Sequence, residues 1–278
     1  MEAKNNKDIY ETKIIDCICC WYDLLGYGAP FIEAKWDLND ERCQKNAERL
    51  SSIYNYFRGN LLNACPGITK LSFIDGAICN IDIDYSENNL RQVVRFLDAV
   101  FSDYQTLNFY DQKHENPGVR GVLTAGQRFQ CDSFDSSYDL KSKRTVEFTP
   151  HVFQMNTAFS KAYIMEESGR AHGVAGANLY VDEELFKYLD RLFRISSDYS
   201  LCYCEESDAI IVKILCRELS LLSISLDRKK IPYKYKGIET NLFRLIDVES
   251  YYDELARAAA HMEAQRYSKI EEQSEDDW

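Results

Sequence analysis

The sequence predicts an α+β fold, in which an antiparallel-containing sheet carries helices packed on it. Short apolar segments with strand character alternate with longer segments whose apolar residues recur every three or four positions. The first six predicted elements follow the order β-α-β-β-α-β, which is that of ferredoxin-like and palm-type sheets. With 278 residues the chain is long enough for one large domain with a sizeable core.

The first half of the chain supplies this series. Lys13 to Tyr22 is an apolar run that leads into a carboxylate and a glycine-containing turn, which predicts a buried strand. Helical spacing of apolar residues extends from Asn39 to about Ala64, where Pro66 and Gly67 end it. The next predicted elements are a hairpin over Lys70 to Asp84, a long helix over Asn88 to Phe109 and a strand over Val119 to Gly126.

The second half is expected to close the sheet. An exposed excursion is predicted over Gln130 to Arg144, and a loop rich in Lys and Tyr after Lys229. The elements predicted between them are a strand over Val146 to Phe153, helices over Thr157 to Ser168 and Glu183 to Phe193, and strands over Leu201 to Cys204, Ala209 to Leu215 and Leu219 to Ile224.

Three regions follow from this order. Residues 1–228 form the predicted main domain, and residues 229–270 a C-terminal extension with a loop and a helix from about Ser250 to Tyr267. Residues 271–278 form an acidic tail that we expect to be disordered.

Composition limits the possible partners. The net charge of -12 disfavours wrapping of a nucleic acid by Lys and Arg. It does not exclude a nucleotide, because a bound divalent metal can locally reverse the sign of the field. No run of about 18 uncharged apolar residues is present, so we expect a soluble cytoplasmic protein that does not enter a membrane.

Cysteine usage fits a reducing compartment. Ten cysteines are spread over the chain, and Cys17, Cys19 and Cys20 lie in an apolar run, which indicates small buried thiols. The Cys202 and Cys204 pair has no second CxxC or HxxxH element, so core packing is favoured over zinc binding.

Three segments carry candidate chemistry. Asp23 ends the first apolar strand, Asp75 lies at the hairpin turn, and Arg120 to Gly126 is a strand with two glycines. Two aspartates at the ends of adjacent strands can share Mg²⁺ or Mn²⁺ through hard oxygen ligands, as phosphoryl transfer requires. The alternative is that each aspartate is a turn or capping residue, because Asp before Gly is common in turns.

These segments resemble class III adenylate/guanylate cyclases. Asp23 in YDLLGYG is similar to the first metal aspartate of that family and Asp75 in SFIDGAI to the second, while Val119 to Gly126 resembles the following strand. The helix from Asn156 to Glu166 is similar to one in bacterial members. The matches run in family order over residues 13–225, although each motif is individually short and variable. Within that family the motifs most resemble those of the pyrimidine (uridylate/cytidylate) cyclases of bacterial anti-phage Pycsar systems.

The resemblance implies a class III cyclase fold and the conversion of UTP or CTP to a 3′,5′-cyclic mononucleotide and pyrophosphate. The cyclic mononucleotide would act as a second messenger in anti-phage defence. Mg²⁺ or Mn²⁺ would be held by Asp23, Asp75 and the backbone carbonyl of Leu24. Residues 1–228 would be the catalytic domain. It further implies a homodimer with composite active sites.

The chain departs from the family pattern in its nucleotide-binding positions. Ser160 stands where the family has the transition-state Asn, and Ile164 where it has the phosphate-binding Arg. Leu71 lies near the usual base-reading Lys and Phe153 near the usual Asp, which disfavours adenine.

Two interpretations of these losses remain. Either Arg120 or Lys161 covers the phosphates, or the domain is a catalytically inactive module that binds a nucleotide or a protein. A nucleotidyltransferase or diguanylate-type palm enzyme is less favoured, because the hairpin lacks paired acids.

Overall fold

The computed structural model describes residues 13–59, 67–130, 151–153 and 155–251. The predicted excursion from residue 131 on, the helix from residue 252 on and the tail at 271–278 lie outside these ranges. No helix within the described ranges has both the length and the apolar character that a membrane span requires.

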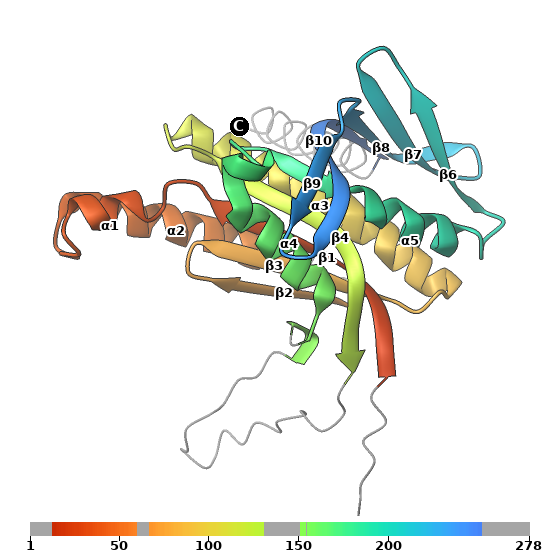
Figure 1. Ribbon diagram of the computed structural model, residues 1–278, viewed down its shortest axis with the longest axis horizontal. Helices are drawn as coiled ribbons and strands as arrows, with labels where there is room; N and C mark the ends of the chain where they lie inside the picture. The colour runs from red at the N-terminus through yellow and green to blue at the C-terminus, as the bar shows by residue number, and fades with distance from the viewer. Residues whose placement is uncertain (1–12, 60–66, 131–150, 154, 252–278) are drawn as a thin grey trace, which may run out of the picture.

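The first half of the chain forms the predicted ferredoxin-like unit (Figure 1). Strand order is β2-β3-β1-β4, and all three neighbouring pairs are antiparallel. This is the arrangement that a β-α-β-β-α-β series produces when the second hairpin strand inserts beside the first strand. Its elements are β1 (Lys13–Leu24), α1 (Ala29–Glu33), α2 (Glu41–Gly59), β2 (Ile68–Phe73), β3 (Gly76–Ile83), α3 (Glu87–Lys113) and β4 (Val119–Gln130).

The second half extends the same sheet beyond β4. There β5 pairs in parallel with β4, and β10 then lies between β5 and β8. The remaining elements are α4 (Thr157–Ser168), β5 (Leu179–Asp182), α5 (Glu183–Phe193), β6 (Tyr199–Glu205), β7 (Ala209–Cys216), β8 (Leu219–Asp227), β9 (Ile231–Tyr235) and β10 (Ile238–Ser250). The α+β class and the mostly antiparallel sheet are therefore confirmed.

Two predictions for the second half were wrong. The loop expected after Lys229 is the β9–β10 hairpin, and β10 is an inner strand of the sheet, so the chain beyond residue 228 belongs to the same fold. The division at residue 228 as a functional boundary stays a prediction. Residues 151–153, expected at the end of a strand, form a 3-10 helix that leads into α4.

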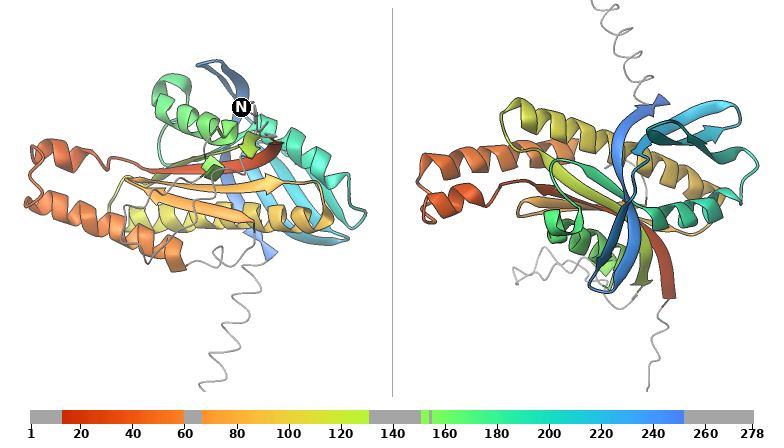
Figure 2. Two further views of the ribbon diagram at one scale, coloured as in Figure 1. Left: turned by 90° about the horizontal axis from the view of Figure 1, so that it is seen from below. Right: turned by 45° about the horizontal axis from the view of Figure 1, so that its top comes forward.

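Helices cover both faces of the sheet (Figure 2). Alternate residues of β1 supply the two cores, because successive side chains of a strand point to opposite faces. Ile18, Cys20 and Tyr22 join the core under α3 and α5, whereas Cys19 and Trp21 join the core under α4.

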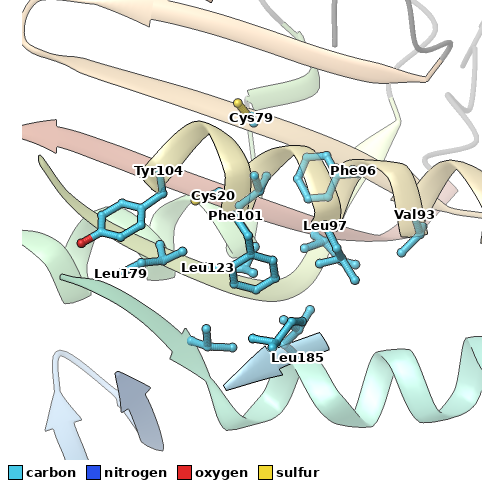
Figure 3. Packing of buried hydrophobic residues seen from close by; sticks show 14 of the residues in the cluster. Cys20, Cys79, Val93, Phe96, Leu97, Phe101, Tyr104, Leu123, Leu179 and Leu185 are labelled. Carbon is cyan, nitrogen blue, oxygen red and sulfur yellow. The ribbon is translucent and has the colours of Figure 1, made fainter. Parts of the chain in front are cut away.

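The larger core is built on α3. Its apolar stripe packs on Cys20 of β1 and Leu123 of β4, with Leu185 of α5 alongside (Figure 3). Burying one such large apolar side chain stabilises the fold by about 1.5–3 kcal/mol. The buried cysteines here are free thiols, as predicted, and burial raises the pKa of Cys79 to about 12.

Helix α4 is fixed to the sheet at its N-terminus. The side chain of Asn156 accepts a hydrogen bond from the Phe159 amide (2.9 Å), which caps the helix, and donates to Asn80 Oδ1 of β3 (2.9 Å). The start of the helix lies close to β4 at Gly126, where a Cβ atom would lie 2.6 Å from Thr157 Oγ1 and 2.7 Å from the Ala158 nitrogen.

We predict that Gly126→Ala destabilises the protein by about 1–3 kcal/mol, because α4 has to move away from β4. Urea denaturation followed by circular dichroism measures the change. Gly28→Ala is the matched control, since a Cβ at Gly28 meets nothing within 4 Å, and it is expected to change stability by less than about 0.5 kcal/mol. Equal unfolding midpoints for the two variants would contradict the close approach.

Candidate functional site

Asp23 and Asp75 lie at neighbouring strand ends. Asp23 is paired in register with Gly76, the first residue of β3, and the Leu24 amide donates a hydrogen bond to the Asp75 carbonyl oxygen (3.0 Å). Both aspartates line a pocket between α2 and the strand ends. The structure thus brings together the two carboxylates that the sequence singled out, and their role as metal ligands stays a prediction.

The hairpin turn that carries Asp75 is held in a strained conformation. Ile74 has a φ of 52°, in the left-handed region that branched residues avoid. Tyr54 of α2 donates a hydrogen bond from its hydroxyl to the Ile74 carbonyl oxygen (2.6 Å), which pins the turn to the helix. On the other side, the ring of Trp21 covers Gly76 so closely that a Cβ there would lie 2.1 Å from its Cη2 atom. Asp75 is therefore positioned from both sides.

A guanidinium and a third carboxylate complete the cluster, which we call the carboxylate site: Asp23, Asp75, Arg120 and Glu166. Arg120 of β4 stands opposite Asp23 in the β1–β4 pairing. Its Nε donates to Glu166 Oε1 of α4 (2.7 Å), and its Nη2 donates to the same oxygen. Trp21 Nε1 donates to the other oxygen, Glu166 Oε2 (3.4 Å).

The electrostatics of the carboxylate site are unbalanced. Burial is the main reason that the pKa of Asp23 is raised to about 7, and the charges of Glu166 and Asp75 raise it further, against the opposing effects of Arg120 and Arg49. Arg49 is itself neutralised by Asp111 (Nη2 to Oδ2, 2.7 Å). With all side chains ionised, three carboxylates and one guanidinium leave two negative charges in the cluster.

This charge and this chemistry fit a divalent cation. Carboxylate oxygens of Asp23 and Asp75 are the hard ligands that Mg²⁺ prefers, and one such ion would neutralise the excess charge. The carbonyl oxygen of Leu24, the third predicted ligand, accepts a hydrogen bond from the Tyr27 amide (3.3 Å). Across the described ranges no group of three or more His, Cys, Asp or Glu side chains has a metal-binding arrangement. Mg²⁺ usually keeps several water ligands and binds through one or two carboxylates together with phosphate oxygens, so two aspartates are enough for the predicted ion.

The turn after β1 rests on a buried ion pair that connects α2 with α3. Arg49 of α2 binds both oxygens of Asp111 and also donates to the carbonyl oxygen of Leu25 (3.1 Å). Asp111 accepts a further hydrogen bond from the Gly118 amide (3.0 Å). The segments that precede β4 and follow β1 are therefore fixed to one another beside Asp23.

Leu71 and Phe153, predicted near the base-reading positions, both belong to the core under α4. Leu71 of β2 is half-buried and packs against this core, and Phe153 is buried within it. The rings of Phe153 and Phe159 meet edge to face, with centroids 6.2 Å apart. The surroundings of these two positions are apolar and aromatic.

The other predicted nucleotide-binding residues lie differently. Ser160 is exposed on α4, and its hydroxyl donates to the Asn156 carbonyl oxygen within the helix (2.9 Å). Ile164 is partly buried. Lys161 faces α5, where its Nζ lies 2.5 Å from Glu184 Oε2 and 3.6 Å from Asp182 Oδ2. Arg120 is the predicted cation that the structure brings to the aspartates.

Glu166, Trp21 and Arg49 were not predicted as site residues. Trp21 precedes Asp23 by two positions on a strand, so both side chains had to share a face, and this signal was present in the sequence. Glu166 and Arg49 reach the site through contacts 46 and 62 positions away along the chain, for which the local sequence holds no signal.

Solved structures of nucleotide cyclases are similar to this chain at low sequence identity. The adenylyl cyclase CyaB from P. aeruginosa is 12% identical with a TM-score of 0.45, over 85% of this chain and 96% of that chain. For the guanylyl cyclase Cya2 the values are 11%, 0.43, 87% and 96%, and for a bacterial light-regulated adenylyl cyclase 10%, 0.42, 88% and 56%. No family model and no curated protein matches the sequence. Similarity of this degree assigns neither family nor activity.

We predict that Asp23→Asn makes the metal-free protein more stable than the wild type, and that this difference in the free energy of unfolding increases as the pH rises. The pKa of Asp23 is raised from 3.8 to about 7 on folding, so the wild type loses stability from this group between about pH 4 and pH 7, whereas Asn does not titrate. Between pH 5 and pH 8 the variant is expected to gain roughly 1–3 kcal/mol over the wild type.

Urea denaturation in EDTA at the two pH values measures this gain. Asp208→Asn, at an exposed aspartate in the β6–β7 turn, is the control and should keep a constant difference from the wild type. A gain for Asp23→Asn that is no larger at pH 8 than at pH 5 would contradict the predicted burial of charge.

Proposed function

We propose that the protein is a metal-dependent nucleotidyl cyclase that converts a nucleoside triphosphate, UTP or CTP, to the 3′,5′-cyclic mononucleotide and pyrophosphate. The observation that carries the proposal is the convergence of Asp23 and Asp75 on adjacent strand ends, in a cluster that has two excess negative charges when all of its side chains are ionised. A divalent cation with a triphosphate is a ligand that such a cluster is suited to bind.

The proposed reaction is an intramolecular displacement. The ribose 3′ oxygen forms a bond to the α-phosphorus, the bond from that phosphorus to the bridging oxygen of pyrophosphate breaks, and the hydroxyl proton is released. When bound, Mg²⁺ or Mn²⁺ would supply neutralisation of phosphate charge and a lowered pKa for the attacking hydroxyl. Asp23 and Asp75 would hold the ion, and Arg120 would face the phosphates.

The preference for a pyrimidine rests on what surrounds the base-reading positions. Leu71 and Phe153 offer no side-chain hydrogen bonds, and Phe153 is buried against Phe159. A site without polar partners cannot reward the edge of adenine, whereas stacking is available to any base. This argument disfavours selection for adenine, and the choice of UTP or CTP follows from the sequence resemblance.

The remaining parts of the proposal follow from the sequence resemblance. They are a homodimer with composite active sites, a cytoplasmic location, and a product that acts as second messenger in bacterial anti-phage (Pycsar) defence. The exposed aromatic side chain of Tyr163, beside the Trp21 ring (centroids 5.6 Å apart), gives the α4 face apolar surface that a second copy would cover.

The direct test is a Mn²⁺-dependent assay with ATP, GTP, CTP and UTP separately, with the products resolved by mass. We expect a cyclic pyrimidine nucleotide from the wild type and a loss of at least about 100-fold in Asp75→Ala, because the cation loses one of its two carboxylate ligands. Asp208→Ala is the matched control and should retain full activity. No pyrophosphate and no cyclic product from any of the four nucleotides would overturn the proposal.

The alternative function is a catalytically inactive nucleotide- or protein-binding module. It is favoured by one observation: both candidate phosphate-binding cations are engaged, Arg120 with Glu166 and Lys161 with Glu184. Thermal-shift titration with each Mn²⁺–nucleotide separates the two functions. A rise in Tm with UTP or CTP but no product would favour the binding module, since a ligand stabilises the folded state in proportion to the logarithm of its concentration over Kd.

A further inference from the structure

Arg120 is paired with a carboxylate of α4 and not with the aspartate opposite it in the sheet. Asp23 and Arg120 lie directly opposite each other on adjacent antiparallel strands, where Cβ atoms are about 4.5–5.5 Å apart and opposite charges attract. Nevertheless, the hydrogen bonds of Arg120 go to Glu166 on α4, and among the ion pairs of the described residues Arg120 is not joined to Asp23.

Glu166 is firmly held in this position. Its side chain is 6% exposed and also accepts from Trp21 Nε1. The neighbouring Met165 and Ala162 are fully buried in the core under α4, so the last turn of the helix is packed against the sheet. A bond to a fixed carboxylate limits the guanidinium to one orientation, because both Nε and Nη2 are committed to the same oxygen.

We infer that Glu166 is a positioning residue of the carboxylate site: by holding Arg120, it keeps that guanidinium from pairing with Asp23 and leaves Asp23 open to a cation. The inference rests on the proposed function, in which Asp23 and Asp75 bind a divalent ion. It gives Glu166 a role that involves no contact with the ion.

The consequence for the triphosphate follows from the same geometry. Arg120 Nη1 has no hydrogen-bond partner within the described part of the chain, whereas Nε and Nη2 are engaged. With Glu166 in place, the Nε and Nη2 edge of the guanidinium is engaged, and Nη1 remains as a donor for a phosphate oxygen. Without Glu166, the nearest partner for Arg120 is its cross-strand neighbour Asp23, and the pair would close the cation site.

The test measures Mn²⁺ binding alone, by the loss of the free Mn²⁺ signal in electron paramagnetic resonance, for the wild type, Glu166→Gln, Arg120→Gln and the double variant. Glu166→Gln is expected to weaken Mn²⁺ binding about tenfold, because Arg120 then occupies Asp23. Arg120→Gln alone is expected to stay within about twofold of the wild type, and the double variant to recover to that level.

Glu167→Gln is the matched control. Glu167 is the next residue of α4 and also pairs with a cation, Lys236 (3.2 Å), but on the exposed side of the helix, so its loss should leave Mn²⁺ affinity unchanged. Because removing one partner of a buried pair destabilises a protein, circular dichroism checks folding, and Glu166→Asp carries the same test where Glu166→Gln does not fold.

The outcomes separate the inference from the proposed function. If the wild type binds no Mn²⁺ at millimolar concentration, both are overturned. If the wild type binds and Glu166→Gln binds equally well, the role of Glu166 is overturned and the cation site stands. If Arg120→Gln tightens binding as much as Glu166→Gln weakens it, the two charges act independently on the ion, and positioning is again overturned.

Discussion

The pairing of β1 on both of its edges is the constraint on which the rest of the structure depends. This strand pairs along its length with β3 on one side and β4 on the other, and helices cover both of its faces. Its side chains have no freedom to change face, because a shift of one residue would exchange the two cores. Asp23, at the end of the strand, therefore has to share the face of Trp21 and Cys19. The carboxylate is placed where burial opposes its charge, and every other charge in the site is arranged around it.

The negative charges of Asp111 and Asp23 are compensated to different extents. Asp111 is fully satisfied by Arg49 and the Gly118 amide, so this buried pair holds the turn after β1 without any ligand. Within the described ranges Asp23 forms no such ion pair, and burial raises its pKa to about 7. A buried carboxylate without a compensating positive charge lowers the stability of the folded state. The contrast between the two aspartates supports the proposal that a cation binds at the Asp23 end of the sheet.

Local sequence signals were sufficient for most of the fold. Helical spacing of apolar residues predicted α2 and α3, while α4 and α5 were predicted over the ranges that they occupy, and the position of Asp75 before a glycine predicted the β2–β3 turn. Prediction failed for strands whose formation depends on pairing with residues that are distant in the sequence. Strand β5 has four residues and is defined by its partners β4 and β10, while β9 carries Lys and Tyr residues that mask its alternation. The same holds for the site. Asp23 and Asp75 could be found from their local motifs, whereas Glu166 could not, because its partner Arg120 lies 46 positions away in the sequence.

Helix α4 is where the chain departs most from the pattern that its motifs resemble, and its contacts explain how the departure is accommodated. Ser160 and Ile164, in its middle turns, contribute no charge to the site, whereas Asn156 at its start and Glu166 near its end each bind a residue of the sheet. The helix is thereby fixed at both ends over β1 and β4. An acidic residue on α4 paired with a basic residue on β4 places one guanidinium beside the aspartates without requiring a basic residue on the helix itself. The positive charge comes from the sheet, and α4 determines its orientation.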